Sequence, residues 1–488
     1  MKFFCLLFAL CWSCLSLYAS AAPIPEPVAR ALRQSGIPAA AFGAIVMSPE
    51  GRVLWQHNAA TPLNPASVMK VVTTAAALDI LGPAYTWRTD VLVTGPIRDG
   101  RLAGDLVIRG GGNPRLTMES LWLLLRDVMA RGVRHIDGDV VLDRGAFQVD
   151  EVDPGQFDGQ PTRPYNVGPD ALLMHWWSVR LVFVPDTEHR SVAILPEPPL
   201  PEVRIVNQLT LGDGPCDAWP DTPEADPANA TLTFRGTFAA SCGERDRSFV
   251  VLPPLGYARS LFDHLWRELG GTRAGNVRYG STPSMARPLT GADSPTLAEV
   301  VRDINKNSNN VMARHLLLTM GASAGQPATL PAGRAAIMRW LAERQGDDAA
   351  ATVLENGSGL SRIERITPGV LAGVLATAWN GPYGPELASS LPVPGVDGTL
   401  KRKYKDAPIA GRAHLKSGYL ENVRAIAGYV HGPDGRTLIV VGIVNHDRAR
   451  EAAAVPEALV QWTLEQTERP LCCGGMQPAA GRRGARPR

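Results

Sequence analysis

The sequence predicts a mixed α/β fold in which both ends of the chain build one domain and a strand-rich insert lies between them. Three observations support this prediction: apolar strand pairs near each end, helical stretches beside them, and a middle part dense in proline and glycine. With 488 residues, the chain is long enough for two or three domains with large cores.

The two ends of the chain carry the strands of the expected sheet. Residues 26–36 (EPVARALRQSG) predict a helix that ends at its glycine, and residues 40–57 predict two strands around a Ser-Pro-Glu-Gly turn. Near the other end, residues 424–430 (RAIAGYV) and 437–445 (TLIVVGIVN) flank a Gly-Pro-Asp-Gly turn, and a helix over 448–468 follows. We therefore expect one sheet that both ends complete, with helices beside it.

The middle of the chain, residues 90–288, predicts short strands separated by turns. One helix, over 117–131, interrupts them. We expect this part to form an insert of one or two small domains. The main domain then consists of a first part, residues 22–89, and a second part, residues 289–470.

Residues 1–21 have the composition of a cleaved export signal: a lysine, an apolar run and a small-residue cleavage site. The apolar run is too short to span a bilayer. The residues around Cys14 do not resemble a lipoprotein cleavage site, so we expect an exported protein with no transmembrane or lipid anchor. The basic tail, residues 471–488, is expected to be disordered.

The cysteines and the charge exclude several classes of protein. Export permits disulfides, and Cys216 with Cys242 is the natural pair, because Cys472 and Cys473 are adjacent in the tail. Once residues 1–21, which hold Cys5, Cys11 and Cys14, are removed, no CxxC, HExxH or His/Asp cluster remains, so we expect neither a metal nor a cofactor. A net charge of +2, without a basic stretch interleaved with aromatics, gives no reason to expect a nucleic-acid partner.

The stretch LNPASVMKVVTTAAALDILG, residues 63–82, predicts a helix that places Ser67 and Lys70 one turn apart. Asn64 is the expected N-cap and Pro65 the first helical residue. Ser67 then lies in the first turn, where free amide N–H groups favour developing negative charge. A desolvated lysine on the same face could lose its proton and take one from the serine. A Ser-x-x-Lys match by itself is most often a surface coincidence.

Two further motifs follow in the order S-x-x-K, S-x-N, K-S/T-G. The tripeptide Ser-Asn-Asn at 308–310 lies between two predicted helices, and Lys-Ser-Gly at 416–418 lies on a strand beside the terminal hairpin. Taken singly, the first is equally a polar turn that caps a helix, and the second an edge strand with a solvated lysine. Each motif is matched once in the chain, and coincidence must explain all three matches in this order.

The three motifs together resemble the signature of the penicilloyl serine transferases. The long gap between Ser67 and Ser308 leaves room for an insert that small β-lactamases lack. The chain from 26 to 470 resembles the penicillin-binding protein 4 type of D-alanyl-D-alanine carboxypeptidase/endopeptidase. Residues 109–117 (RGGGNPRLT) and 355–368 (ENGSGLSRIERITP) are similar to two further segments of that family.

The resemblance implies a β-lactamase/transpeptidase-like domain, an antiparallel sheet flanked by helices, that carries the strand-rich insert. It also implies a periplasmic enzyme that acts on peptidoglycan stem peptides and is acylated by β-lactams. The chain departs from the family pattern at four positions: Asn113, Arg314, Glu355 and Ser417. At 314 a glutamate is usual, so the contacts of the helix around Arg314 are in doubt.

The resemblance also implies roles for individual residues. Ser67 is the expected nucleophile, Lys70 its general base, and Ser308 the group that relays a proton towards the leaving amine. Lys416 adds positive charge that helps to keep Lys70 neutral. The backbone N–H groups of Ser67 and Tyr419 form the expected oxyanion hole. The residues expected to contact substrate are Asn310, Lys416, Ser417, Gly418, Tyr419 and, in the SGLSR segment, Arg362.

Two other functions remain open at this point. A β-lactamase shares the acylation machinery but deacylates rapidly, and a non-catalytic peptidoglycan- or antibiotic-binding protein would need no intact machinery. All three motifs lie outside residues 90–288. We therefore expect that the insert is not required for acylation.

Overall fold

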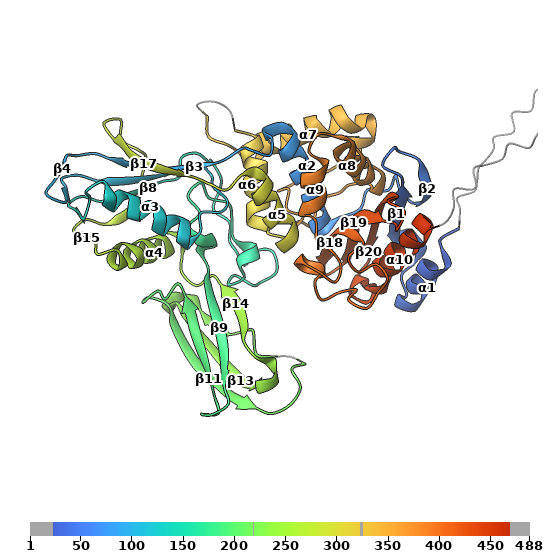
Figure 1. Cartoon of the computed structure of the whole chain (residues 1–488), viewed down its shortest axis with the longest axis horizontal. Helices are drawn as coiled ribbons and strands as arrows, with labels where there is room; N and C mark the ends of the chain where they lie inside the picture. The colour runs from blue at the N-terminus through green and yellow to red at the C-terminus, as the bar shows by residue number, and fades with distance from the viewer. Residues whose placement is uncertain (1–22, 218, 323–325, 469–488) are drawn as a thin grey trace, which may run out of the picture.

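The structure is a computed structural model that describes residues 23–217, 219–322 and 326–468. The predicted signal peptide and basic tail lie outside these ranges. The molecule is elongated, with both ends of the described chain in one domain and the insert at the other end (Figure 1). Within the described ranges, no helix has both the length and the apolar content that crossing a bilayer requires.

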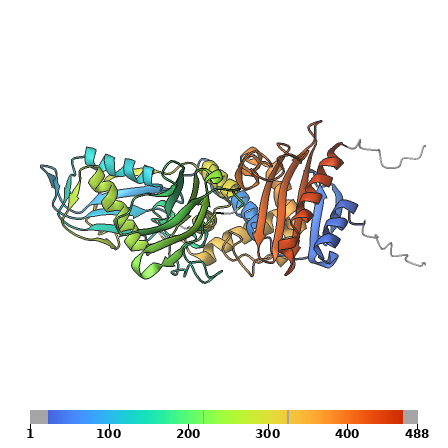
Figure 2. The same cartoon turned by 90° about the horizontal axis from the view of Figure 1, so that it is seen from below.

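A five-stranded antiparallel sheet forms the centre of the main domain, in the order β18-β19-β20-β1-β2. The first strand of the chain pairs with the last, so that Ile45 lies opposite Val441. The predicted mixed α/β fold with a sheet completed by both ends is confirmed (Figure 2). The strands are β1 (Phe42–Met47), β2 (Val53–His57), β18 (Ala413–Leu420), β19 (Val423–His431) and β20 (Thr437–Asn445).

Helices cover both faces of this sheet, which explains why its inner strands are continuous apolar runs. In β1, Ala44 and Val46 pack with α1 and α10, while Ile45 and Met47 belong to the core on the opposite face, with α2 and α8. The helices of this domain are α1 (Glu26–Ser35), α2 (Met69–Leu81), α5 (Leu297–Asn307), α6 (Asn310–Met320), α7 (Leu330–Gln345), α8 (Pro368–Asn380), α9 (Gly384–Ser390) and α10 (Ala454–Glu468).

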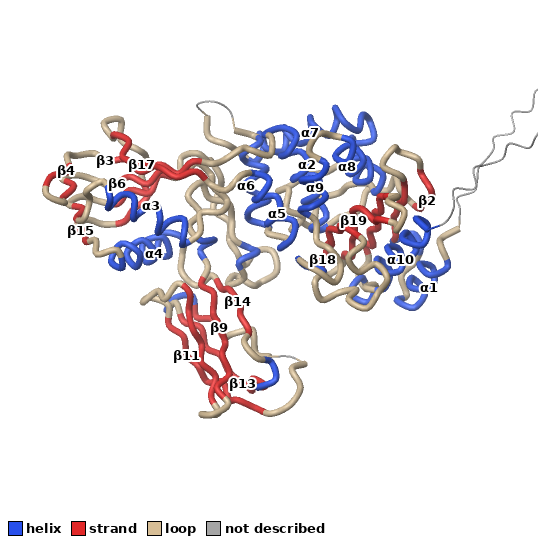
Figure 3. Tube along the Cα trace, in the orientation of Figure 1, coloured by secondary structure: helices blue, strands red, loops and turns tan. Residues whose placement is uncertain are grey.

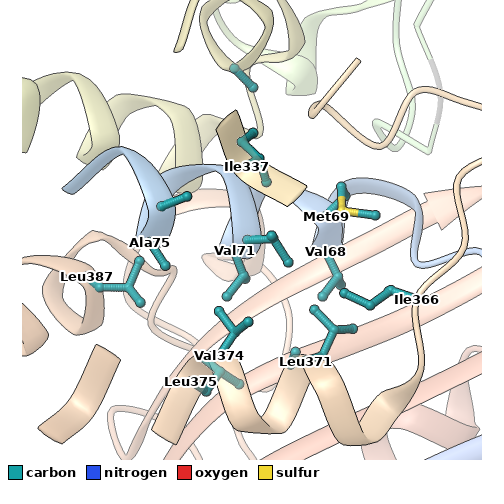
Figure 4. Packing of buried hydrophobic residues seen from close by; sticks show 14 of the residues in the cluster. Val68, Met69, Val71, Ala75, Ile337, Ile366, Leu371, Val374, Leu375 and Leu387 are labelled. Carbon is teal, nitrogen blue, oxygen red and sulfur yellow. The ribbon is translucent and has the colours of Figure 1, made fainter. Parts of the chain in front are cut away.

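Helix α2 lies at the centre of the larger core and is buried over most of its surface. Val71 and Ala75 pack among side chains of α7, α8 and α9, including Leu371 and Val374 (Figure 4). Full burial of each such aliphatic side chain stabilises the fold by about 1.5–3 kcal/mol. Because packing surrounds α2, its position is fixed by the core and not by one amphipathic face.

The insert contains two strand-rich units (Figure 3). The first has a five-stranded sheet, β16-β8-β6-β3-β17, and a small four-stranded sheet, β15-β7-β5-β4. The strands that enter and leave the insert, β3 and β17, pair with each other, and the boundaries expected at 90 and 288 fall inside them. The strands of this unit are β3 (Arg88–Val93), β4 (Ile97–Arg98), β5 (Arg101–Leu102), β6 (Leu106–Gly110), β7 (His135–Ile136), β8 (Val140–Asp143), β15 (Thr272–Arg273), β16 (Val277–Tyr279) and β17 (Arg287–Asp293).

The first unit also carries two helices, α3 (Met118–Ala130) and α4 (Pro254–Glu268), of which the sequence predicted only α3. Helix α4 begins with Pro-Leu-Gly, a combination typical of a turn, and this hid its start. Its buried residues Tyr257, Leu261 and Leu265 recur every four positions and face the core of the insert.

The second unit consists of two three-stranded sheets, β10-β9-β14 and β11-β13-β12. An aromatic cluster holds them together, with the rings of Phe183 and Phe234 5.0 Å apart. The predicted pair Cys216–Cys242 forms a disulfide in this unit, with a Cα–Cα distance of 4.9 Å. The strands are β9 (Val179–Asp186), β10 (Ser191–Glu197), β11 (Arg204–Gly212), β12 (Glu224–Asp226), β13 (Thr231–Ala239) and β14 (Arg245–Phe249).

Removal of this disulfide should destabilise the second unit by about 3 kcal/mol, because the bond closes a long loop in the unfolded chain. Urea denaturation of a Cys216→Ala/Cys242→Ala variant, compared with wild type, measures the effect. Wild-type protein with reductant added is the matched control and should lose the same stability. If both cysteines react with an alkylating agent in the native protein, the bond is absent in solution.

Candidate active site

The turn that carries Ser67 is held in place from two sides of the main domain. The Asn64 side chain accepts a hydrogen bond from the Ala66 N–H at 2.8 Å, and its backbone pairs with the Asn445 side chain at the end of β20, at 2.7 and 2.9 Å. The helix begins with a 3-10 turn, Ala66–Val68, that runs directly into α2. Pro65, predicted as the first helical residue, lies one position before it.

Two glycines from other elements lie against the same turn. A Cβ atom on Gly418, in β18, would lie 2.5 Å from the Pro65 carbonyl oxygen. A Cβ atom on Gly359 would lie 1.9 Å from the Ala66 carbonyl oxygen, and Gly359 also has a φ of +79°. Only glycine permits so close an approach at these two positions. The glycine of Lys-Ser-Gly and that of Ser-Gly-Leu therefore enclose the Ser67 turn between them.

Lys70 lies one turn after Ser67 and its side chain is completely buried. Its Nζ donates to Ser67 Oγ at 3.1 Å, to Asn310 Oδ1 at 2.6 Å and to the Ser358 carbonyl. Burial holds the pKa of Lys70 well below its ordinary range, and the positive charge of Lys416 lowers it further. The free amine, which can accept a proton from Ser67, is favoured by this environment.

Ser308 and Lys416 form a second serine–lysine pair. Ser308 ends α5 in a left-handed conformation with φ 56°, which turns the chain into α6. Lys416 Nζ donates to Ser308 Oγ at 3.0 Å and to the Ser417 carbonyl at 2.8 Å. Lys416 is also completely buried, and burial lowers its pKa to about 7.

Asn310 connects the site to the insert. While its Oδ1 accepts from Lys70, its Nδ2 donates to the Tyr165 carbonyl at 3.1 Å. One turn along α6, the Arg314 guanidinium donates to the Val167 carbonyl at 2.9 Å, and His315 accepts from the Asp170 N–H at 3.2 Å. The insert thus supplies four hydrogen-bond partners to α6, the fourth being the Gly112 carbonyl, 3.0 Å from His315 Nδ1. We predicted from the sequence that acylation does not require the insert, and this stays a prediction. The contacts between the insert and α6 argue against that prediction.

The other residues predicted to contact substrate, Ser417, Tyr419 and Arg362, lie at the edge of the site. The Tyr419 side chain is 60% exposed, and the Arg424 guanidinium lies 3.8 Å from its ring centre. Ser417 Oγ lies 3.4 Å from the hydroxyl of Thr399. Arg362 is exposed and turned towards the insert, where it donates to the Phe157 carbonyl at 3.1 Å and stacks over the Phe157 ring. It lines a cavity of about 370 Å³ beside the site, apart from the serine–lysine pairs.

Sequence reasoning missed three contributors to this site: the Ser358 carbonyl, the buried carboxylate of Glu364 and the Tyr165 carbonyl of the insert. Two of them are backbone groups, whose partners depend on tertiary structure alone. Among the residues that the structure describes, no group of three or more His, Cys, Asp or Glu could hold a metal ion. The chemistry available here is that of hydroxyls, amines and backbone amides.

A serine hydroxyl beside a buried amine, with a second serine–lysine pair opposite, defines a serine hydrolase of the penicilloyl serine transferase class. The chain belongs to the D-Ala-D-Ala carboxypeptidase 3 (S13) family, whose sequence profile matches residues 25–466. It is a serine-type D-alanyl-D-alanine carboxypeptidase of the penicillin-binding protein 4 type, as the sequence motifs predicted.

Similar proteins cover nearly the whole described chain. The D-alanyl-D-alanine carboxypeptidase of Actinomadura sp. (strain R39) is 28% identical over 455 residues, 89% of this chain and 83% of that protein. The D-alanyl-D-alanine carboxypeptidase DacB of Haemophilus influenzae is 25% identical over 399 residues, 81% of this chain and 83% of that protein. The crystal structure of penicillin binding protein 4 (dacB) from H. influenzae matches with a TM-score of 0.69 and 24% identity, over 90% of this chain and 98% of that one; the same protein has been solved in complex with a β-lactam.

Gly418→Ala should slow acylation by about 100-fold, because the new Cβ would push the Pro65–Ala66 turn and displace the serine hydroxyl. Stopped-flow acylation with a fluorescent penicillin measures the rate, and thermal melting shows whether the variant is folded. Gly256→Ala, in α4 of the insert, is the control and should acylate at the wild-type rate, since only a proline side chain lies near its Cβ. A folded Gly418→Ala variant with an unchanged rate would contradict the role given to this glycine.

Proposed function

We propose that Ser67 attacks the carbonyl of the penultimate D-alanine and that Lys70 takes its proton. The observation that carries this proposal is the 3.1 Å contact between Ser67 Oγ and the Nζ of a completely buried lysine. A lysine in such an environment is neutral at lower pH than an exposed one. The attack forms an acyl-enzyme on Ser67 and releases the terminal D-alanine as an amine, and water then hydrolyses the ester.

Ser308 and Lys416 act on the leaving side of the scissile bond. The Ser308 hydroxyl, 3.0 Å from Lys416 Nζ, relays a proton to the departing amine. Lys416 and the Ser417 hydroxyl bind the terminal carboxylate of the substrate, and the Asn310 amide binds its backbone. The N–H groups of Ser67 and Tyr419 stabilise the oxyanion.

The substrate class follows from the terminal carboxylate that Lys416 would bind and from the family to which the chain belongs. We infer that the enzyme acts on peptidoglycan stem peptides in the periplasm after removal of residues 1–21. It releases the terminal D-alanine, and it cleaves cross-links where the leaving amine belongs to a second stem peptide. β-Lactams acylate Ser67 in the same way, and Arg362 and Phe157 contact substrate at the cavity beside the site.

Ser67→Ala should abolish covalent labelling by penicillin without unfolding the protein, because loss of one hydrogen bond costs only about 0.5–1.5 kcal/mol of stability. Intact-mass spectrometry after a penicillin pulse shows the adduct. Ser389→Ala, an exposed serine on α9, is the control and should label fully. An adduct on Ser67→Ala would overturn the assignment of the nucleophile.

Lys70→Arg should also lose acylation, since arginine stays protonated at any workable pH and cannot act as the base. The same mass measurement serves, and Lys403→Arg on the exposed surface is the control. Rapid release of the acyl group from wild type, with no D-alanine released from a stem peptide, would instead indicate a β-lactamase.

The pH dependence of kcat/KM for a D-Ala-D-Ala peptide should be bell-shaped. Activity rises with pH as Lys70 loses its proton, at a pH well below ~10.4. It falls above pH about 7, because the pKa of Lys416 in the free enzyme is about 7 and the neutral amine no longer binds a carboxylate. Bound carboxylate raises this pKa, so the alkaline limb of kcat should lie at higher pH.

Initial rates of D-alanine release across acid to alkaline buffers test this profile. The control is acylation by a β-lactam ester, in which the carboxylate is blocked, so that the alkaline fall due to Lys416 should disappear. An alkaline fall that is the same for the blocked and the free ligand would show that Lys416 charge does not bind the carboxylate.

A further inference from the structure

Glu364 is a completely buried carboxylate close to the site that the proposed mechanism does not use. Its Oε1 accepts three successive backbone N–H groups, from Glu355 at 3.1 Å and from Asn356 and Gly357 at 3.0 Å each. Such a run of N–H groups forms a concave anion-binding nest. Three donors on one oxygen suit an ionised carboxylate, and they oppose the burial that raises the pKa of Glu364 above its ordinary value.

The loop that Glu364 holds is the loop that binds Lys70. The next residue, Ser358, presents its carbonyl to Lys70 Nζ, and the Gly357 carbonyl accepts from the Thr73 hydroxyl of α2 at 2.6 Å. The Glu364 N–H donates to the Ser361 hydroxyl at 3.0 Å, which anchors the acid to the same segment. Movement of the Glu364 carboxylate would therefore move the acceptor of the Lys70 amine.

The charges that face Lys70 come from three elements. Lys416 lies on β18, Arg314 on α6 and Glu364 on the loop before α8, and of these only Glu364 is negative. Arg314 is more than nine-tenths buried, and its only hydrogen bond to the described residues joins its guanidinium to the Val167 carbonyl. The Arg314 Nε and the Glu364 Oε2 have no hydrogen-bond partner among the residues described. The negative charge of Glu355 raises the pKa of both Arg314 and Glu364.

We propose that Glu364 is a positioning residue that sets the basicity of Lys70 and that Arg314 opposes it. Glu364 holds the Ser358 carbonyl against the Lys70 amine and supplies the negative charge that stabilises its protonated form. Arg314 supplies a buried positive charge that destabilises that form. This inference rests on the proposed function, because it takes Lys70 as the general base.

The two charges act on the base in opposite directions. Burial and Lys416 lower the pKa of Lys70, Arg314 lowers it further, and Glu364 raises it. Loss of the Glu364 charge should thus free the amine at lower pH, and loss of the Arg314 charge should require higher pH. A base works best with a pKa near the operating pH, so a balance between the two charges serves catalysis.

The experiment compares the pH dependence of acylation by a fluorescent penicillin in wild type, Glu364→Gln, Arg314→Gln and the double variant. The acid limb should move down by about one pH unit in Glu364→Gln and up by about one unit in Arg314→Gln, since one nearby charge shifts a pKa by about 1–3 units. In the double variant the two shifts should largely cancel. At a pH on the acid limb, a shift of one unit is a tenfold change in rate.

Two matched controls separate charge from structure. Arg314→Lys keeps the positive charge, so the acid limb of its pH profile should lie at the same pH as in wild type. Glu343→Gln makes the same chemical change on the exposed surface of α7 and should leave both rate and limb unchanged. A lower rate in Glu364→Gln and Arg314→Gln with an unmoved limb would overturn the proposal, since it would show that both residues support structure alone.

The outcome does not depend on every variant folding. If Glu364→Gln fails to fold, an unmoved limb in Arg314→Gln is sufficient to overturn the proposal, because the one hydrogen bond of Arg314 among the described residues goes to Val167 and not to the nest. A wild-type protein that penicillin does not label at all would mean that the proposed function has failed. Normal wild-type labelling with unmoved limbs in the variants would mean that only this inference has failed.

Discussion

The buried amine of Lys70 is the constraint on which the rest of the site depends. A primary amine without solvent needs hydrogen-bond partners, and it obtains them from Ser67, Asn310 and the Ser358 carbonyl, which belong to three separate parts of the chain. These hydrogen bonds join the first two motifs and the SGLSR segment around one amine, and Lys416 of the third motif bonds to Ser308 of the second. The same burial that costs stability lowers the pKa of this amine, which favours the unprotonated state that a general base requires.

The core of the main domain provides the rigidity that this arrangement needs. Because α2 is packed on most sides, small changes around it cannot be absorbed by tilting the helix. The turn before it is confined between Gly418 and Gly359, with no space for a Cβ at either position. The serine hydroxyl is thus positioned by the sheet on one side and by the SGLSR loop on the other.

Much of this could be predicted from the sequence, and the parts that could not have a common cause. The strands near both ends are long apolar runs beside clear turns, and the three motifs are local patterns, so pattern reading finds them. Helix α4 was missed because its first turn contains proline and glycine. The contact of Asn310 with the Tyr165 carbonyl, and that of Glu364 with its nest, join residues by tertiary packing and leave no local pattern.

Arg314 links the insert to α6, the helix that also carries Asn310. A glutamate at 314 would place a second negative charge near Glu364, whereas arginine balances it and reaches the Val167 carbonyl of the insert. Asn310, Arg314 and His315 lie on one side of α6, and all three bind backbone groups of the insert segment 165–170. Helix α6 begins at the Ser-x-N motif, so any shift of this segment is transmitted to Asn310 and, through it, to Lys70. The insert therefore contacts the site through the helix that carries its second motif and, in addition, through Arg362 of the SGLSR loop.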